Sequence, residues 1–111
     1  MVTKDDKIPE IKCPVTGLIQ LIGGKWKPII LYCLKPGKKR FGEISARIPT
    51  ISRKVLTEQL KELELDGLIS RAQFKEIPPR VEYSLTELGK SLSPLLLEME
   101  KWGTENILKH Q

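Results

Sequence analysis

The sequence predicts a single, mainly helical domain that carries one small β-hairpin. Apolar residues recur at helical spacing over most of the 111 residues, and strand-like alternation is concentrated around residues 80–85. Glycine or proline closes nearly every segment. A chain of this length supplies one hydrophobic core but not two. We therefore expect a flexible segment over residues 1–12 and one domain over residues 13–111.

The composition excludes several classes of protein. The longest apolar run, Ile29 to Leu34, is too short to cross a bilayer, and the N-terminus lacks the apolar region of an export signal. We therefore expect a cytoplasmic protein with no membrane partner. There Cys13 and Cys33 are expected as thiols, and together with His110 they supply too few ligands for zinc. Catalytic and phosphate-cradling motifs are missing, so the sequence predicts no enzyme, no metal and no cofactor.

Two helices are expected first. Pro14 suits the first position of a helix, which Gly23 and Gly24 end after Ile22. The second helix runs from Trp26 to Leu34 and ends at a Lys-Pro-Gly run. The apolar positions of the two helices are Val15, Leu18, Ile19 and Ile22, then Trp26, Ile29, Ile30, Cys33 and Leu34.

A pair of helices joined by a tight turn follows. The first spans about Phe41 to Ile48, and the second spans about Ser52 to Asp66 with Ser52 as its N-cap. Gly67 supplies the left-handed residue that ends the second helix. The inward positions are Phe41, Ile44 and Ile48, then Val55, Leu56, Leu60 and Leu63. This arrangement indicates a helix-turn-helix.

The second half of the chain adds a hairpin and a long helix. Residues 68–75 and 80–85 have strand character, and the turn between them contains two prolines. Thr86 caps a helix that continues to about Lys109, and Pro94 should kink or divide it near Ser93. Five of its apolar residues form a heptad seam: Leu88, Leu92, Leu95, Met99 and Trp102. A helix-turn-helix followed at once by a hairpin predicts a winged helix-turn-helix fold.

The positive charge is concentrated in one stretch. The chain carries a net charge of +5, yet residues 25–54 hold nine Lys and Arg against a single Glu. This stretch covers the first helix of the pair, the turn and the start of the second helix, which meet phosphates and base edges in a winged helix. The pattern therefore indicates double-stranded DNA as partner. The alternatives are a solvated basic face and a winged-helix module that binds proteins without specific DNA binding.

Nine residues are candidate DNA contacts. Four begin the second helix of the pair, where side chains can read bases and backbone N–H groups can bind a phosphate. Three precede the first helix of the pair and are expected on phosphates, and two flank the hairpin loop as candidates for the neighbouring groove. In that order they are Ser52, Arg53, Lys54 and Thr57, then Lys38, Lys39 and Arg40, then Lys75 and Arg80. For Arg80, an ion pair with Glu76 or Glu82 is the alternative.

Several ordered strings between residues 13 and 103 resemble one family. They include Cys13-Pro14, Ile22-Gly23-Gly24-Lys25-Trp26, Arg40-Phe41-Gly42-Glu43-Ile44, Ile51-Ser52-Arg53-Lys54-Val55-Leu56-Thr57, Asp66-Gly67-Leu68-Ile69, Pro78-Pro79-Arg80-Val81-Glu82-Tyr83-Ser84-Leu85-Thr86 and Trp102-Gly103. Together they resemble the HxlR-type winged-helix transcriptional regulators of bacteria and archaea. The resemblance implies a homodimeric, sequence-specific DNA-binding regulator with a palindromic operator, and a repressor is favoured over an activator.

The resemblance further implies that the dimer forms largely through the first and last helices. The interface candidates are Leu18, Leu88, Leu92, Leu95, Met99 and Trp102. Packing of the last helix on its own domain is the alternative.

Cys13 is the candidate redox sensor. It precedes the first helix, whose positive dipole end favours a thiolate. Its position resembles that of the redox-active cysteine in some family members, so an oxidant or another small molecule is a candidate effector. A quiet, half-buried cysteine is the alternative.

Overall fold

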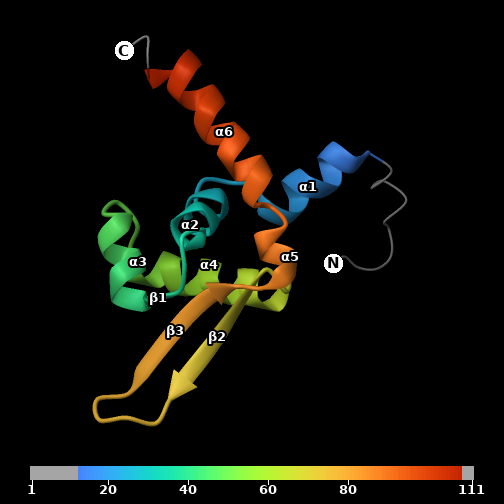
Figure 1. Cartoon of the computed structure of the whole chain (residues 1–111). Coiled ribbons are helices and arrows are strands. Elements are labelled where there is room, and N and C mark those ends of the chain that lie inside the picture. The colour runs from blue at the N-terminus through green and yellow to red at the C-terminus, as the bar shows by residue number, and fades with distance from the viewer. Residues whose placement is uncertain (1–12, 109–111) are drawn as a thin grey trace.

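The computed structural model describes residues 13–108, which form six helices and three strands (Figure 1). In chain order these are α1 (Pro14–Ile22), α2 (Lys27–Leu34), β1 (Lys39–Arg40), α3 (Phe41–Arg47), α4 (Arg53–Leu65), β2 (Ile69–Phe74), β3 (Arg80–Leu85), α5 (Glu87–Lys90) and α6 (Ser93–Asn106). The flexible segment predicted at residues 1–12 lies outside the described residues, as do residues 109–111.

The predicted helix-turn-helix and its boundaries are confirmed. Ser52 is the N-cap of α4, and its Oγ accepts a hydrogen bond from the backbone N–H of Val55 at 3.1 Å. Gly67 follows α4 with φ of 78°, a left-handed conformation that glycine adopts without steric cost. These local signals act within a few residues, which is why the sequence located both ends of α4.

The hairpin belongs to a three-stranded antiparallel sheet in the order β1-β3-β2. β1 was not predicted from the sequence. It pairs with β3, with Lys39 opposite Tyr83 and Arg40 opposite Glu82. A strand of two residues is too short to show alternation, so only its pairing with β3 identifies it. Beyond β1 the hairpin projects from the body of the domain as the wing (Figure 1).

The long helix predicted after Thr86 is divided into α5 and α6, as the position of Pro94 indicated. Pro94 lies in the first turn of α6, where its missing N–H costs no helical hydrogen bond. The heptad seam is therefore not continuous. Leu88 lies on α5, Leu92 lies between the two helices, and the other three residues lie on α6. α6 rises away from the sheet (Figure 1).

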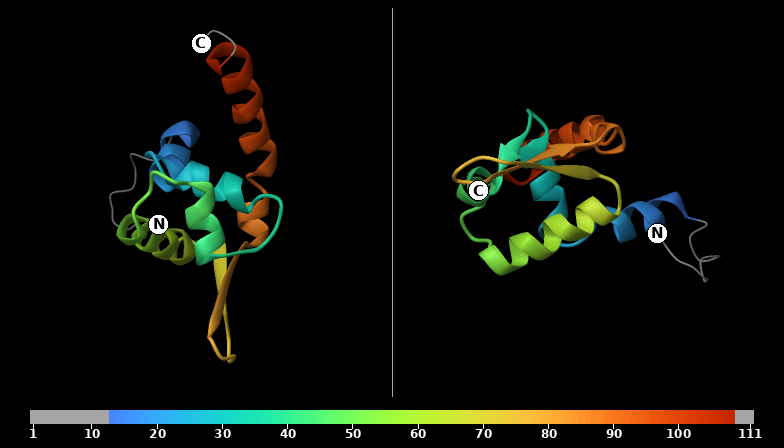
Figure 2. Two further views of the ribbon diagram at one scale, coloured as in Figure 1. Left: turned by 90° about the vertical axis from the view of Figure 1, so that its left-hand side faces the viewer. Right: turned by 90° about the horizontal axis from the view of Figure 1, so that it is seen from below.

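The core lies where α2, α3, α4 and the base of the sheet meet. Its fully buried side chains are Ile30, Leu31, Leu34, Ile44, Leu56, Leu60, Leu63, Leu68 and Ile69. The inward positions predicted for α3 and α4 are confirmed, with Phe41 and Val55 partly buried. In α1, Ile22 is buried, but Val15 and Ile19 are 63% and 60% exposed. The start of α1 projects from the domain, so its apolar stripe extends beyond the core (Figure 2).

Three further features bear on function. Among the helices of residues 13–108, none is long and apolar enough to cross a membrane. In the same part of the chain, His, Cys, Asp and Glu form no group of three that could hold a metal ion. Cys13 and Cys33 are both free thiols.

Candidate nucleic-acid interface

The first turns of α4 present the predicted base-reading residues to solvent. Ser52, Arg53, Lys54 and Thr57 are all exposed. The Thr57 hydroxyl donates a hydrogen bond to the Arg53 carbonyl oxygen at 2.8 Å. Because its proton is used within the helix, this hydroxyl offers an outside partner a lone pair rather than a donor.

Arg53 lies against the neighbouring helix. Its guanidinium carbon is 4.7 Å from the centroid of the Phe41 ring at the start of α3. A guanidinium over a ring face keeps its in-plane N–H groups available for paired hydrogen bonds. The contact also restricts the side chain before binding, which reduces the conformational entropy lost when DNA is bound. Sequence reasoning missed this contact because Phe41 and Arg53 belong to different helices.

The basic run before α3 lies where the helix-turn-helix meets the wing. Lys38 is 69% exposed, and its Nζ lies 3.5 Å from Glu82 Oε1 on β3. Lys39 is half-buried in β1, whereas Arg40 is exposed. The Arg40 backbone N–H donates a hydrogen bond to Glu43 Oε1 at 2.8 Å, so the Glu43 carboxylate holds the start of α3.

The two wing candidates differ in their surroundings. Arg80 Nη2 is 3.1 Å from Glu76 Oε2, and Arg80 Nε is 3.5 Å from Glu82 Oε2. The Arg80 guanidinium also lies 4.1 Å from the centroid of the Phe74 ring. The ion pairs considered as an alternative for Arg80 are therefore both present. Lys75 follows β2 and is exposed.

The two cysteines differ in acidity. Cys13 is exposed at the N-cap of α1, where the Thr16 hydroxyl and the backbone N–H groups of Thr16 and Val15 favour the thiolate and so lower its pKa below the ordinary value. Burial raises the pKa of Cys33 on α2. Cys13 is thus the thiol with more thiolate at neutral pH. The direction agrees with the sequence argument, but the hydroxyl of Thr16 was not foreseen.

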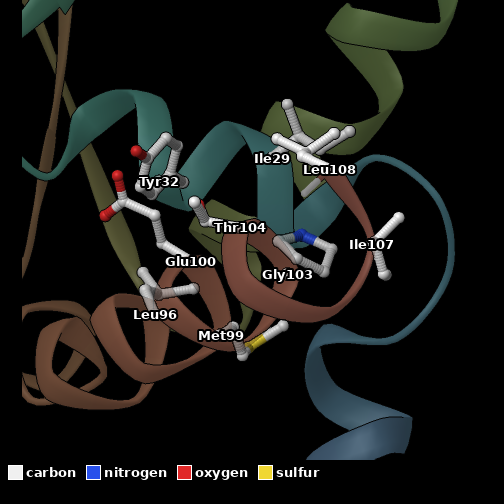
Figure 3. A pocket seen from close by; sticks show the side chains of 10 residues that line it. Ile29, Tyr32, Leu96, Met99, Glu100, Gly103, Thr104, Ile107 and Leu108 are labelled. Atoms are coloured by element: carbon white, nitrogen blue, oxygen red, sulfur yellow. The ribbon is translucent and has the colours of Figure 1, made fainter. Parts of the chain in front are cut away.

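An apolar groove of about 380 Å³ runs between α2 and α6 (Figure 3). Ile29 and Met99 contribute to its lining and are 40% and 46% exposed. At one end the Glu100 carboxylate lies beside the Tyr32 hydroxyl, and its hydrogen bond raises the pKa of Tyr32. The groove was not predicted, because residues from α2 and α6 meet only in the folded chain.

The six predicted interface residues fall into two groups. Met99, Trp102 and Leu88 are exposed, with Trp102 at 63% and Leu88 at 56%. Leu18 and Leu92 are partly buried against the core, and Leu95 is also partly buried. Their place in an interface between two chains stays a prediction.

Comparison with known proteins identifies the family. A family model described as HxlR-like helix-turn-helix matches residues 21–111. The chain belongs to this family. It is therefore a helix-turn-helix transcriptional regulator of the HxlR type, and the family is not one of enzymes.

Individual relatives of this HxlR-type chain agree with that assignment. The uncharacterized HTH-type transcriptional regulator YdeP of Bacillus subtilis (strain 168) is 54% identical over 91 residues, which are 82% of this chain and 71% of YdeP. The redox regulator HypR in its oxidized form has a TM-score of 0.81 and 49% identity, covering 85% of this chain and 97% of that chain. The reduced form of the transcriptional regulator YodB from B. subtilis has a TM-score of 0.74 and 39% identity, covering 87% and 96%.

The HxlR-type fold places α4 and the wing next to each other. Seen from below, α4 and the hairpin lie side by side with α3 at one end (Figure 2, right), and α4 packs against β2. The nine candidate contacts lie on or beside these elements. A polar cleft between α4 and the sheet adds Lys61, Arg71 and Tyr83, which sequence reasoning did not select. The four-residue spacing of Thr57 and Lys61 was the available signal for the first of them.

Proposed function

We propose that this protein is a dimeric regulator that binds a specific double-stranded DNA sequence and represses transcription. The observation that carries the proposal is the coincidence of charge and shape. The basic stretch of residues 25–54 includes the exposed start of α4 and the run of residues 38–40, which leads into α3 and pairs with β3 of the wing through β1. α4 enters the major groove, and the wing lies over the flanking groove. The protein acts where the chromosomal DNA is, in the cytoplasm.

Each group of candidates has its own task in this proposal. Arg53 reads a base edge, because its stacked guanidinium presents a fixed pair of donors. Ser52 and Lys54 contact bases or phosphates around it, and the Thr57 hydroxyl accepts a hydrogen bond from a base. Lys38, Lys39 and Arg40 bind phosphates. Lys75 contacts DNA from the wing. Arg80 does so by exchanging its carboxylate partners for a phosphate, which is an equally good bidentate acceptor.

The proposed dimer uses the apolar surface that one chain leaves exposed. Val15 and Ile19 project from α1, and Met99 and Trp102 are exposed on α6. The groove between α2 and α6 offers an apolar seat for α1 of a second copy. Several large apolar side chains exposed on a small domain indicate a contact surface. Two-fold symmetry then requires a palindromic operator with half-sites about one helical turn apart.

The proposal is tested with duplexes selected by the protein from a random pool under reducing conditions. We expect anisotropy titrations to show binding at least about a thousandfold tighter than to a scrambled duplex. Light scattering of the complex should give two protein chains on one palindromic duplex. Equal, weak binding to both duplexes would favour the protein-binding alternative, and one chain per duplex would contradict the dimer.

We further propose that Cys13 regulates DNA binding as a thiol switch. Its exposure and lowered pKa favour attack by the thiolate on an oxidant. With hydrogen peroxide, the thiolate takes one oxygen to give a sulfenic acid and releases hydroxide. The description of HypR as a redox regulator supports this role. The charge and hydrogen bonding at the start of α1 would then change close to the proposed dimer contact.

The acidity of Cys13 leads to a prediction about its pH dependence. We expect iodoacetamide to label Cys13 faster than Cys33 at neutral pH. Because the pKa of Cys13 is lowered, its labelling rate should fall only as the pH drops through that lowered value. Thr16→Val should move the midpoint of this pH profile to a higher pH, since it removes the hydroxyl that stabilises the thiolate. An unchanged midpoint in Thr16→Val would refute this cause.

The switch itself is checked by DNA binding after treatment with peroxide. We expect peroxide to change the DNA affinity of the wild type. This change should disappear in Cys13→Ser and persist in Cys33→Ser, which serves as the matched control. A response that survives in Cys13→Ser would rule out Cys13 as the sensor.

A further inference from the structure

We propose that the cleft between α4 and the hairpin binds one phosphate of the DNA backbone through Lys61, Arg71 and Tyr83. The inference rests on the proposed DNA-binding function and adds three contacts to it. The cleft has a volume of about 290 Å³, and its lining also includes Thr57 and Glu64. Its residues come from the middle of α4 and from both long strands, so it exists only in the folded domain.

The strand register directs one wall of the cleft toward α4. Ile69 of β2 is paired with Leu85 of β3, and both side chains are buried in the core. Two residues further along, Arg71 is paired with Tyr83. Side chains two positions apart in a strand share a face, so this pair continues the inward face just where the hairpin leaves the core. Because α4 packs against β2, the pair borders the helix.

The other wall continues the proposed base-reading side of α4. Arg53, Thr57 and Lys61 follow one another at intervals of four residues, which places them along one side of the helix. Lys61 is exposed. The cleft is therefore continuous with the surface assigned to DNA, and an anion bound in it would lie beside the duplex rather than apart from it.

The chemistry of the lining fits a phosphate. Arg71 supplies a planar fork of donors, Lys61 an ammonium and Tyr83 a phenol O–H, opposed by the single carboxylate of Glu64. Within residues 13–108, the ion pairs closer than 4.0 Å involve neither Lys61 nor Arg71. On the opposite face of the hairpin, by contrast, Arg80 is paired with carboxylates. The two cleft cations are thus left for an external anion.

The position of the cleft selects the DNA backbone as the source of that phosphate. In a winged helix, the reading helix occupies the major groove and the wing reaches the neighbouring groove. The DNA backbone that separates the two grooves must then pass between α4 and the wing. The cleft is lined by residues of both elements, so it lies on the path of that backbone.

Salt dependence of DNA binding tests the proposal. Loss of one neutralised phosphate makes the slope of log K against log salt shallower by about 0.9. We expect Lys61→Met and Arg71→Met each to make the slope shallower by up to this amount, since both cations hold the same phosphate, and to do so with the selected and the scrambled duplex alike, because phosphate contacts carry no sequence information. Lys101→Met removes the same charge from α6, the helix that rises away from the sheet (Figure 1), and should leave the slope unchanged.

The outcomes separate this proposal from the function on which it rests. Wild-type slopes in Lys61→Met and Arg71→Met would overturn the phosphate site, while a preference for the selected duplex would still support specific DNA binding. If the wild type shows no preference for the selected duplex, the proposed function is refuted. The salt slopes of wild type and variants on scrambled DNA would still test the phosphate site in the cleft.

Methylphosphonate scanning identifies the phosphate. Neutralising one backbone position should weaken wild-type binding, and the same substitution should weaken the binding of Arg71→Met and of Tyr83→Phe by less, because each variant has already lost one of the three contacts to that phosphate. Inorganic phosphate is the second probe. If it stabilises the DNA-free wild type but not Arg71→Met, while the salt slopes remain unchanged, the cleft serves a free anion and the DNA assignment is overturned.

Discussion

Arg53→Ala is expected to weaken binding to the selected duplex by about 1–3 kcal/mol, because it removes a base-reading guanidinium. The side chain lies on the exposed first turn of α4 and is stacked on the Phe41 ring. Its donors are therefore oriented before DNA binds, and little side-chain entropy is lost on binding. Removing the side chain thus saves little entropy to offset the lost hydrogen bonds. Anisotropy titrations of the selected and scrambled duplexes measure the change.

Two controls distinguish base reading from charge. Arg53→Lys keeps the positive charge but cannot form the paired hydrogen bonds of a guanidinium. It should therefore bind scrambled DNA as the wild type does and lose preference for the selected duplex. Lys101→Met should preserve that preference. If Arg53→Ala weakened binding to both duplexes equally, Arg53 would be a phosphate contact and not a base reader.

Leu63→Ala is expected to lower the free energy of unfolding by about 2–5 kcal/mol, as is typical when a fully buried leucine is truncated. Leu63 has no exposed surface and joins α4 to the core. The loss is a large share of the about 5–15 kcal/mol that holds a small domain together. Urea unfolding, followed by circular dichroism, measures it.

Leu65 provides a control on the same helix. Its side chain is 81% exposed, so Leu65→Ala should change the free energy of unfolding by no more than about 0.5 kcal/mol. Equal effects of the two substitutions would mean that α4 does not pack as described. The same preparations can be titrated with DNA, which shows whether loss of stability and loss of binding are separable.

The helix-turn-helix was accessible to sequence reasoning because its signals are local. The Ser52 cap, the left-handed Gly67 and the spacing of Leu56, Leu60 and Leu63 all act within one helix or turn. The basic stretch was equally visible, since it is contiguous in the chain. Periodicity also found the hairpin, and Pro94 marked the division between α5 and α6.

Helical periodicity was less informative about which apolar residues are buried. Val15 and Ile19 share the spacing of Ile22, yet the structure exposes the first two and buries the third. Heptad spacing likewise does not identify the buried side of α6, because Leu96 lies outside the seam and is buried, whereas Met99 and Trp102 of the seam are exposed. Burial depends on where neighbouring elements end, and that information is not contained in one helix.

The sequence by itself determined the winged helix-turn-helix order, the position of α4 and its caps, and the location of the basic stretch. The tertiary structure alone decided β1, the stacking of Arg53 on Phe41, the ion pairs of Arg80 and the cleft that joins Lys61 to Arg71. The physical reason is the range of the interactions. Caps, turns and periodicity act between close neighbours in the chain, whereas each of the features decided by the tertiary structure depends on contacts between separate elements.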